Sequence, residues 1–202
     1  LVHSEQGHLT LTGTPEDYQL DLTSKISGQQ IPTGHWTIAA QGNQQAVTLT
    51  KLRTELLKGT VAATGHVSWH PQLVGQLNLD VDQITVKDFW KEWPDRLRVS
   101  TQLAAKLEGD HFQIDQLDVT LPQTAAKLSV TGEGRLAGDN TRLENLTLTW
   151  QDLQWPLVGK KPLATSKTGR VNASGTPQNY RVDLAAQLAG AQVPKSQLTL
   201  AR

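Results

Sequence analysis

Apolar and polar residues alternate along most of this chain. The longest uninterrupted run extends from Leu97 to Leu107, where every second residue is Leu, Val, Thr or Ala. A period of two places these side chains on one face of an extended strand. Turn signals such as Gly13-Thr14-Pro15 and Gly109-Asp110 separate the alternating runs at intervals of roughly 8–14 residues. The pattern therefore predicts an all-β fold whose successive strands pair in an antiparallel meander.

Three segments depart from simple alternation. Residues 51–58 (KLRTELLK) carry charges at helical spacing but lie between strand patterns, and we predict a strand there. Residues 88–93 predict a single helical turn, because Asp88 can cap its start and Pro94 ends it. The polar stretch 159–168 predicts a loop between strands, since alternation resumes directly after it.

The beginning of the chain is repeated at its end. Residues 7–40 and 169–202 align without a gap at an offset of 162 positions. Both copies contain Gly-Thr-Pro, at 13–15 and 175–177, and both place a tyrosine three residues after the proline. Such a repeat indicates a chain built by repetition of β units. We therefore predict that residues 1–202 form a single continuous β-repeat segment of a larger protein.

The alternation leaves open how the apolar face of the sheet is covered. A second sheet, in a sandwich or a barrel, usually needs bulky residues in the middle. This chain is 37% hydrophobic and has only 2 Phe, 2 Tyr and 6 Trp. A trough that shelters an acyl chain is the alternative, because burying each CH₂ group contributes about 0.8 kcal/mol. Composition does not decide between a self-filled interior and a lipid-filled one.

The alternation also selects the residues that would form an apolar strip in such a trough. The predicted strip consists of Leu20, Leu22, Ile26, Ile38, Leu77, Leu79, Val81, Leu97, Val99, Leu103, Leu107, Leu146, Leu148, Trp150, Val182, Leu184 and Leu188.

Composition excludes several classes of function. The 19 basic and 19 acidic residues balance, so no basic excess points to a nucleic-acid partner. The chain has no cysteine, which excludes disulfides and thiolate metal sites. It has no methionine and no run of 18 apolar residues, so we expect any signal peptide or membrane anchor to lie outside this sequence.

The sequence contains no catalytic constellation. His66 and His70 have a metal-ligand spacing only on a helix, and here they flank a predicted strand. Asp80 and Asp82 share the polar face of a strand without a convergent partner, so they are better explained as solvated side chains. We expect no enzymatic activity, no metal site and no cofactor.

Four of the six tryptophans occur in two pairs. Trp90 and Trp93 lie in the segment DFWKEWP, and Trp150 and Trp155 in LTLTWQDLQWPL. Tryptophan can anchor a protein at a groove mouth or an interface. The favoured interpretation is that these side chains fill irregular ends of the β core.

Four segments of the sequence share a recurring pattern of glycine turns and alternating apolar residues: GTVAATGHVSW, KLSVTGEGRL, LTLTWQDLQWPL and WPDRLRVSTQLAAKLEG. In these segments the chain resembles the TamB family, with the AsmA-like proteins as more distant relatives. The resemblance covers essentially all 202 residues. The resemblance lies in a repeating sequence pattern. The family has no motif-defined functional residues that could be assigned to positions in this chain.

The resemblance implies an elongated, curved antiparallel β-sheet, folded into a taco-like trough with a hydrophobic groove. It also implies a periplasmic protein that is anchored to the inner membrane through a segment outside this chain. The implied ligands are phospholipids, which the family is linked to transporting between the inner and outer membranes.

Two other functions remain open. TamB-like proteins are linked to an Omp85-type outer-membrane partner, TamA, which would be contacted by parts of the chain not present here. A segment of such a protein could therefore be a scaffold or chaperone for the assembly of outer-membrane β-barrels and autotransporters, through strand addition at sheet edges. The least favoured alternative for the function is an extracellular β-sandwich binding module.

Overall fold

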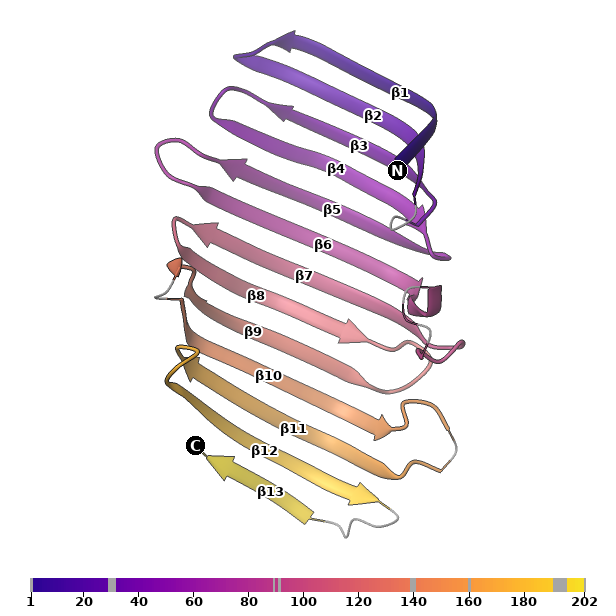
Figure 1. Ribbon diagram of the computed structural model, residues 1–202, viewed down its shortest axis with the longest axis vertical. Helices are drawn as coiled ribbons and strands as arrows, with labels where there is room; N and C mark the ends of the chain where they lie inside the picture. The colour runs from indigo at the N-terminus through magenta and orange to yellow at the C-terminus, as the bar shows by residue number, and fades with distance from the viewer. Residues whose placement is uncertain are drawn as a thin grey trace.

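The computed structural model describes residues 2–28, 32–88, 90, 92–138, 141–159, 161–190 and 196–201. In this part of the chain, 13 strands form one sheet whose spatial order follows the sequence order (Figure 1). Each strand pairs antiparallel with the strand that follows it. The all-β antiparallel meander predicted from the alternation is confirmed.

The strands are long and the connections between them are short. Their bounds are β1 (Val2–Thr14), β2 (Asp17–Gly28), β3 (Gly34–Gly42), β4 (Ala46–Leu56), β5 (Gly59–Ser68), β6 (Val74–Thr85), β7 (Arg98–Glu108), β8 (His111–Thr120), β9 (Lys127–Arg135), β10 (Arg142–Trp155), β11 (Ala164–Gly175), β12 (Tyr180–Gly190) and β13 (Ser196–Ala201). A short 3-10 helix, η1 (Val86–Asp88), follows β6. Among the described residues, no helix has the length and apolar character needed to cross a bilayer.

The structure changes the bounds of three predicted segments. The strand predicted over residues 51–58 ends at Leu56, because Leu57 and Lys58 take positive φ values of 51° and 63° in the two-residue turn to β5. The helical turn predicted over residues 88–93 lies earlier, as η1, while Phe89 and Lys91 are outside the described residues. The predicted loop 159–168 ends sooner, since β11 already begins at Ala164.

The sheet is a single open layer. It curves along its length (Figure 1), as twisted antiparallel sheets do. All strands of the described residues belong to this one sheet, so they do not form the sandwich or barrel that composition left open. One face therefore keeps its apolar side chains without a second sheet against them.

β-Bulges keep the apolar side chains on one face. In β4 the register shifts between Leu49, which is opposite Ala40, and Leu52, which is opposite Ile38. Leu49 and Leu52 are three residues apart, so strict alternation would place them on opposite faces. The bulge restores the same face for both. A similar shift lies between Val81 and Ile84 of β6.

The buried apolar cluster lies at one rim of the sheet. It consists of Leu97, Leu121 and Ala126, with Trp93, Val99, Leu153 and Leu157 packed against them. We call this set the rim cluster. Its residues come from the connection after β6, from the connection after β8 and from the end of β10. These three parts lie at the same side of the sheet (Figure 1).

Leu97 differs from its prediction. As the first residue of an alternating run, it is predicted to belong to the apolar strip. In the structure β7 begins one residue later, at Arg98, and Leu97 is fully buried in the rim cluster. The assignment to the strip is therefore wrong for this residue, because the connection from η1 folds its side chain into the cluster.

Candidate ligand-binding face

One row of apolar side chains crosses the entire sheet. Each member is the cross-strand partner of the next, without a polar interruption. We call it the central apolar row, and it consists of Leu9, Leu22, Ile38, Leu52, Ala63, Leu79, Leu103, Leu117, Val130, Leu148, Val171, Leu184 and Leu200. At about 4.8 Å between neighbouring strands, the row extends over roughly 55–60 Å.

A second row runs beside the central apolar row on the same face. On most strands its member lies two residues from the member of the central apolar row, and a bulge makes this spacing three residues on β4 and β8. It is built from Leu11, Leu20, Ala40, Leu49, Gly65, Leu77, Ala105, Ile114, Gly132, Leu146, Ala173 and Val182. Small and large side chains mix in this row, so its surface is uneven.

The register places the predicted strip residues, apart from Leu97, on this same face. Six belong to the central apolar row and four to the second row: Leu22, Ile38, Leu79, Leu103, Leu148 and Leu184, then Leu20, Leu77, Leu146 and Val182. Ile26, Val81, Val99, Leu107, Trp150 and Leu188 lie in the flanking rows. Whether these side chains bind lipid stays a prediction.

Much of this apolar face is open to solvent. Leu77, near the middle of the sheet, is 40% exposed, and Leu11 on β1 is 65% exposed. A contiguous exposed apolar surface is uncommon on a soluble protein and marks an interaction site. Within the central apolar row and the second row, the exposure is greatest on β1 and β13, where a strand has a neighbour on one side only in the described sheet.

A shallow hollow of about 330 Å³ lies on the apolar face between β4 and β7. Its apolar lining includes Val47, Leu49, Leu77 and Leu107. Gly65 and Gly75 lie between these side chains, and the missing side chains of these glycines leave the space. The apolar part of this lining has the character that a hydrocarbon chain would need, and the lining also includes His66 and Lys106.

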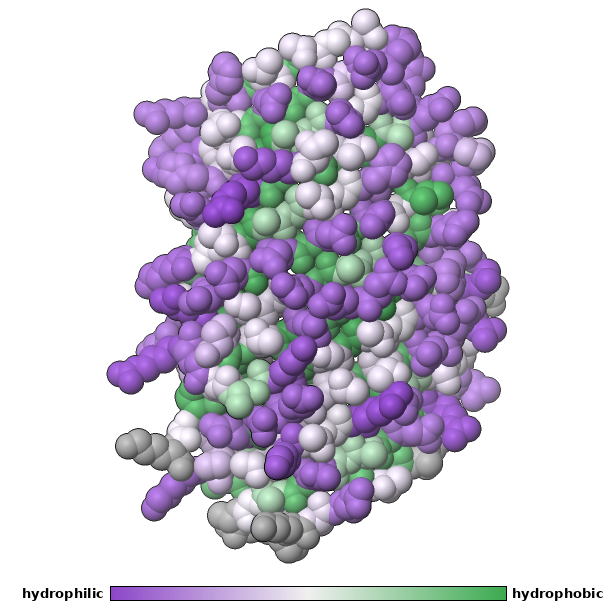
Figure 2. Space-filling model, turned by 180° about the vertical axis from the view of Figure 1, so that it is seen from behind, coloured by the Kyte–Doolittle hydropathy of each residue, from purple (hydrophilic) through white to green (hydrophobic). Residues whose placement is uncertain are grey.

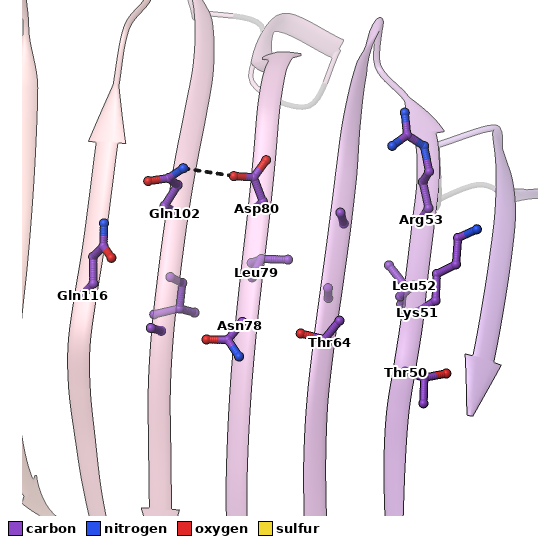
Figure 3. A pocket seen from close by; sticks show the side chains of 14 residues that line it. Thr50, Lys51, Leu52, Arg53, Thr64, Asn78, Leu79, Asp80, Gln102 and Gln116 are labelled. Carbon is purple, nitrogen blue, oxygen red and sulfur yellow. Dashed lines mark hydrogen bonds between the residues drawn. The ribbon is translucent and has the colours of Figure 1, made fainter. Parts of the chain in front are cut away.

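The opposite face is polar. Hydrophilic side chains predominate in Figure 2, with hydrophobic atoms visible between them. A hollow of about 490 Å³ on β4–β8 is lined by Lys51, Arg53, Asp80 and Gln102, among others (Figure 3). The Gln102 amide donates a hydrogen bond of 3.2 Å to Asp80 (Figure 3). These side chains are exposed, so we interpret the hollow as part of a solvated surface.

The polar face carries a hydrogen-bonded carboxylate at Asp118. The Ser129 hydroxyl and the Gln116 amide both donate hydrogen bonds to this carboxylate, and Lys127 lies 3.4 Å away. The hydrogen bond from Ser129 is the largest cause that lowers the pKa of Asp118, followed by the one from Gln116. The ionised carboxylate is therefore stabilised in the folded sheet relative to the unfolded chain.

Ser129→Ala is expected to raise the pKa of Asp118 toward its ordinary value. Because the folded pKa lies below the unfolded one, Asp118 stabilises the fold above the unfolded pKa, and this contribution is lost as the pH falls through the folded pKa. The variant should be less stable than the wild type at pH 7, by a margin that shrinks below about pH 4. Urea unfolding at pH 7 and pH 3 measures both margins, and an equal margin at the two pH values would contradict the assignment.

The candidate chemical groups identified in the sequence do not converge. His66 interacts with the Thr48 hydroxyl at 2.9 Å on the polar face. Asp80 and Asp82 each accept a hydrogen bond from β7, from Gln102 and Ser100 respectively. In the described part of the chain, no three His, Cys, Asp or Glu side chains are grouped as a metal ion would require.

The tryptophans divide between packing and exposure. Trp93 belongs to the rim cluster and donates its N–H to the Leu97 carbonyl at 3.1 Å, which fits the favoured interpretation. Trp150 lies on the apolar face and donates to Ser166 Oγ at 2.8 Å. Trp90 and Trp155 are 56% and 65% exposed, so they do not fill a core.

A comparison with protein families identifies the architecture. The model of the TamB N-terminal domain matches residues 1–143 and residues 127–202, which together cover the chain. The chain belongs to the TamB family. The comparison with solved structures found no match.

The TamB assignment agrees with the fold and narrows the class of function. The two matched segments overlap at residues 127–143, as expected for a sequence built from similar strand pairs. The TamB family is a transport and assembly module and is not a known enzyme family. A TamB-family protein acts in the periplasm in association with a membrane.

Proposed function

We propose that this TamB-family segment shelters phospholipid acyl chains on its apolar face during transport between the inner and outer membranes. The central apolar row is the observation that supports this proposal most directly. It continues through all 13 strands without a charged or strongly polar residue. Its length of roughly 55–60 Å exceeds the ~30 Å thickness of a bilayer's hydrocarbon core. The row is therefore long enough for acyl chains to lie along the face, with their headgroups in water.

The energetics of the apolar face suit transient shelter. An acyl chain gains about 0.8 kcal/mol for each CH₂ group removed from water. The side chains of the face are already arranged by the sheet, so little ordering cost falls on the protein when a chain binds.

Photocrosslinking at paired positions tests the proposal. A photoreactive residue at Leu103 or Leu184 is expected to crosslink to phospholipid. The same residue at Gln102 or Asp183, each adjacent in the chain but on the opposite face, should not. Mass spectrometry of the crosslinked and co-purified lipids identifies the class that is bound.

Equal crosslinking from both faces would contradict a lipid-binding face. Crosslinks to unfolded outer-membrane proteins along β1 and β13, unaffected by charged residues on the apolar face, would instead favour the assembly scaffold. The two results differ in the molecule that is captured as well as in the face that captures it.

A further inference from the structure

Gly75 lies within β6 on the apolar face, and its own geometry does not require a glycine. Its cross-strand partners are Val67 of β5 and Leu107 of β7. It has no positive φ, and the register is regular on both sides of it, so neither a turn nor a β-bulge explains the residue. The nearest atoms to an added Cβ would be Leu107 Cβ at 3.6 Å and the His66 carbonyl oxygen at 3.9 Å, which are ordinary contact distances.

The other glycines of β5 and β6 have a local reason. An added Cβ at Gly59 or Gly65 would collide with a backbone carbonyl oxygen of β6, that of Asp82 or Gln76 respectively. Glycine within a strand weakens it, and it often marks a bulge, the close approach of another backbone or the approach of a ligand. At Gly75 the first two reasons are absent, which leaves the approach of a ligand.

The space that Gly75 leaves belongs to the hollow of about 330 Å³ between β4 and β7. We call it the Gly75 hollow. Val67 and Leu77 of its lining are 39% and 40% exposed. The hollow is therefore open to solvent on the apolar face, and a ligand can enter it without a rearrangement of the protein.

Two polar side chains of the lining are engaged with partners outside it. The His66 ring interacts with the Thr48 hydroxyl at 2.9 Å, and the Lys106 ammonium lies 2.7 Å from the Asp115 carboxylate. Neither Thr48 nor Asp115 lines the hollow. A ligand in the Gly75 hollow would therefore bind mainly through the apolar side chains.

The backbone around the Gly75 hollow is unsuited to a peptide ligand. β5 and β6 are each paired with a neighbouring strand on both sides, so a further strand cannot be added here. A hydrocarbon chain needs no hydrogen bonds and gains free energy from each CH₂ group that leaves water. The hollow thus favours a hydrocarbon chain over a peptide segment.

We propose that the Gly75 hollow is a binding site for one acyl chain of a phospholipid, and that the missing side chain of Gly75 sets its capacity. This inference rests on the proposed function and adds a position to it. The hollow lies beside the central apolar row, since its apolar lining belongs to the second row and to the cross-strand row that contains Gly75. An acyl chain that leaves the central apolar row between β4 and β7 would rest there.

Substitutions that fill the Gly75 hollow test the site. Gly75→Val and Ala105→Leu fill it from two strands, because Ala105 also belongs to the lining. The probe is a phosphatidylethanolamine with a photoreactive diazirine on one acyl chain, crosslinked to the purified protein. In the wild type, crosslinks should concentrate at Val47, Leu77 and Leu107. Each variant should reduce them at least about fourfold, the factor for one CH₂ group returned to water.

Ala173→Leu is the matched control. It makes the same change as Ala105→Leu in the same second row, but on β11 and outside the Gly75 hollow, so crosslinks at the hollow should be unchanged. Urea unfolding checks the fold. Gly75→Val should raise the urea midpoint, because valine is favoured over glycine in strands and a Cβ fits at this position. Weaker crosslinking in a more stable protein cannot result from loss of the fold.

The outcomes separate this inference from the proposed function. Three results would overturn the acyl-chain site while leaving a lipid-binding face intact: crosslinks spread evenly over the apolar face, unchanged crosslinks at the hollow in both Gly75→Val and Ala105→Leu, or an equal reduction in Ala173→Leu. Absence of crosslinks from the apolar face would overturn the proposed function, and the acyl-chain site with it.

Discussion

Leu97→Ala is expected to lower the free energy of unfolding by about 2–5 kcal/mol, the range for truncating a fully buried leucine. Leu97 is 0% exposed and is the most deeply buried member of the rim cluster. An open single-layer sheet has few other places where apolar side chains are removed from water on all sides. The cavity left by the truncation would therefore weaken the packing between three parts of one rim.

Chemical denaturation of the two proteins measures this effect. Leu11→Ala is the matched control, since Leu11 is 65% exposed on β1 and its truncation should cost less than about 1 kcal/mol. Hydrogen exchange should also become faster in the connections after β6 and β8. A loss for Leu97→Ala no larger than that for Leu11→Ala would show that the rim cluster contributes little to stability.

Leu103→Asp is expected to reduce the amount of co-purifying phospholipid tenfold or more. Leu103 is a member of the central apolar row, between Leu79 and Leu117. A carboxylate there would have to lose its water under a bound acyl chain, at a cost of several kcal/mol, and about 1.4 kcal/mol already corresponds to a factor of ten. Lipid mass spectrometry of the purified proteins gives the ratio.

The fold must persist for this result to report on binding. Leu103 is only half-buried in the sheet, so a carboxylate at this position can reach water when no lipid is bound. Circular dichroism and thermal unfolding check this condition. Ala104→Asp places the same charge on the polar face of the same strand, opposite the uncharged Asn78 and Gln116, and should retain the wild-type amount of lipid. Equal losses in both variants would indicate a general effect of charge.

The sequence was sufficient to predict the strands and the face on which most side chains lie. Alternation in runs such as Leu103 to Leu107 reports the local geometry of one strand, and antiparallel pairing follows from the short turns. Alternation contains no information about what lies above the apolar face. The choice between a sandwich and a single open layer therefore required the structure.

The bulges can be recognised in the sequence, although a search for a strict period of two misses them. Apolar residues spaced by three, such as Leu49 and Leu52, coincide with shifts in register. The prediction for Leu97 failed for a different reason, because packing with a distant connection decides its position. The continuity of the central apolar row, for example from Ile38 to Leu52, depends on the register between two strands, which neither strand encodes alone.

Uniformity along the central apolar row has a consequence for how lipids would move. A bound acyl chain that advances by one strand, about 4.8 Å, exchanges one leucine-like contact for another of similar strength. Its free energy along the sheet would thus be nearly level. Under the proposed function, movement would be one-dimensional thermal diffusion, and the supply and removal of lipid at the two ends would set its direction.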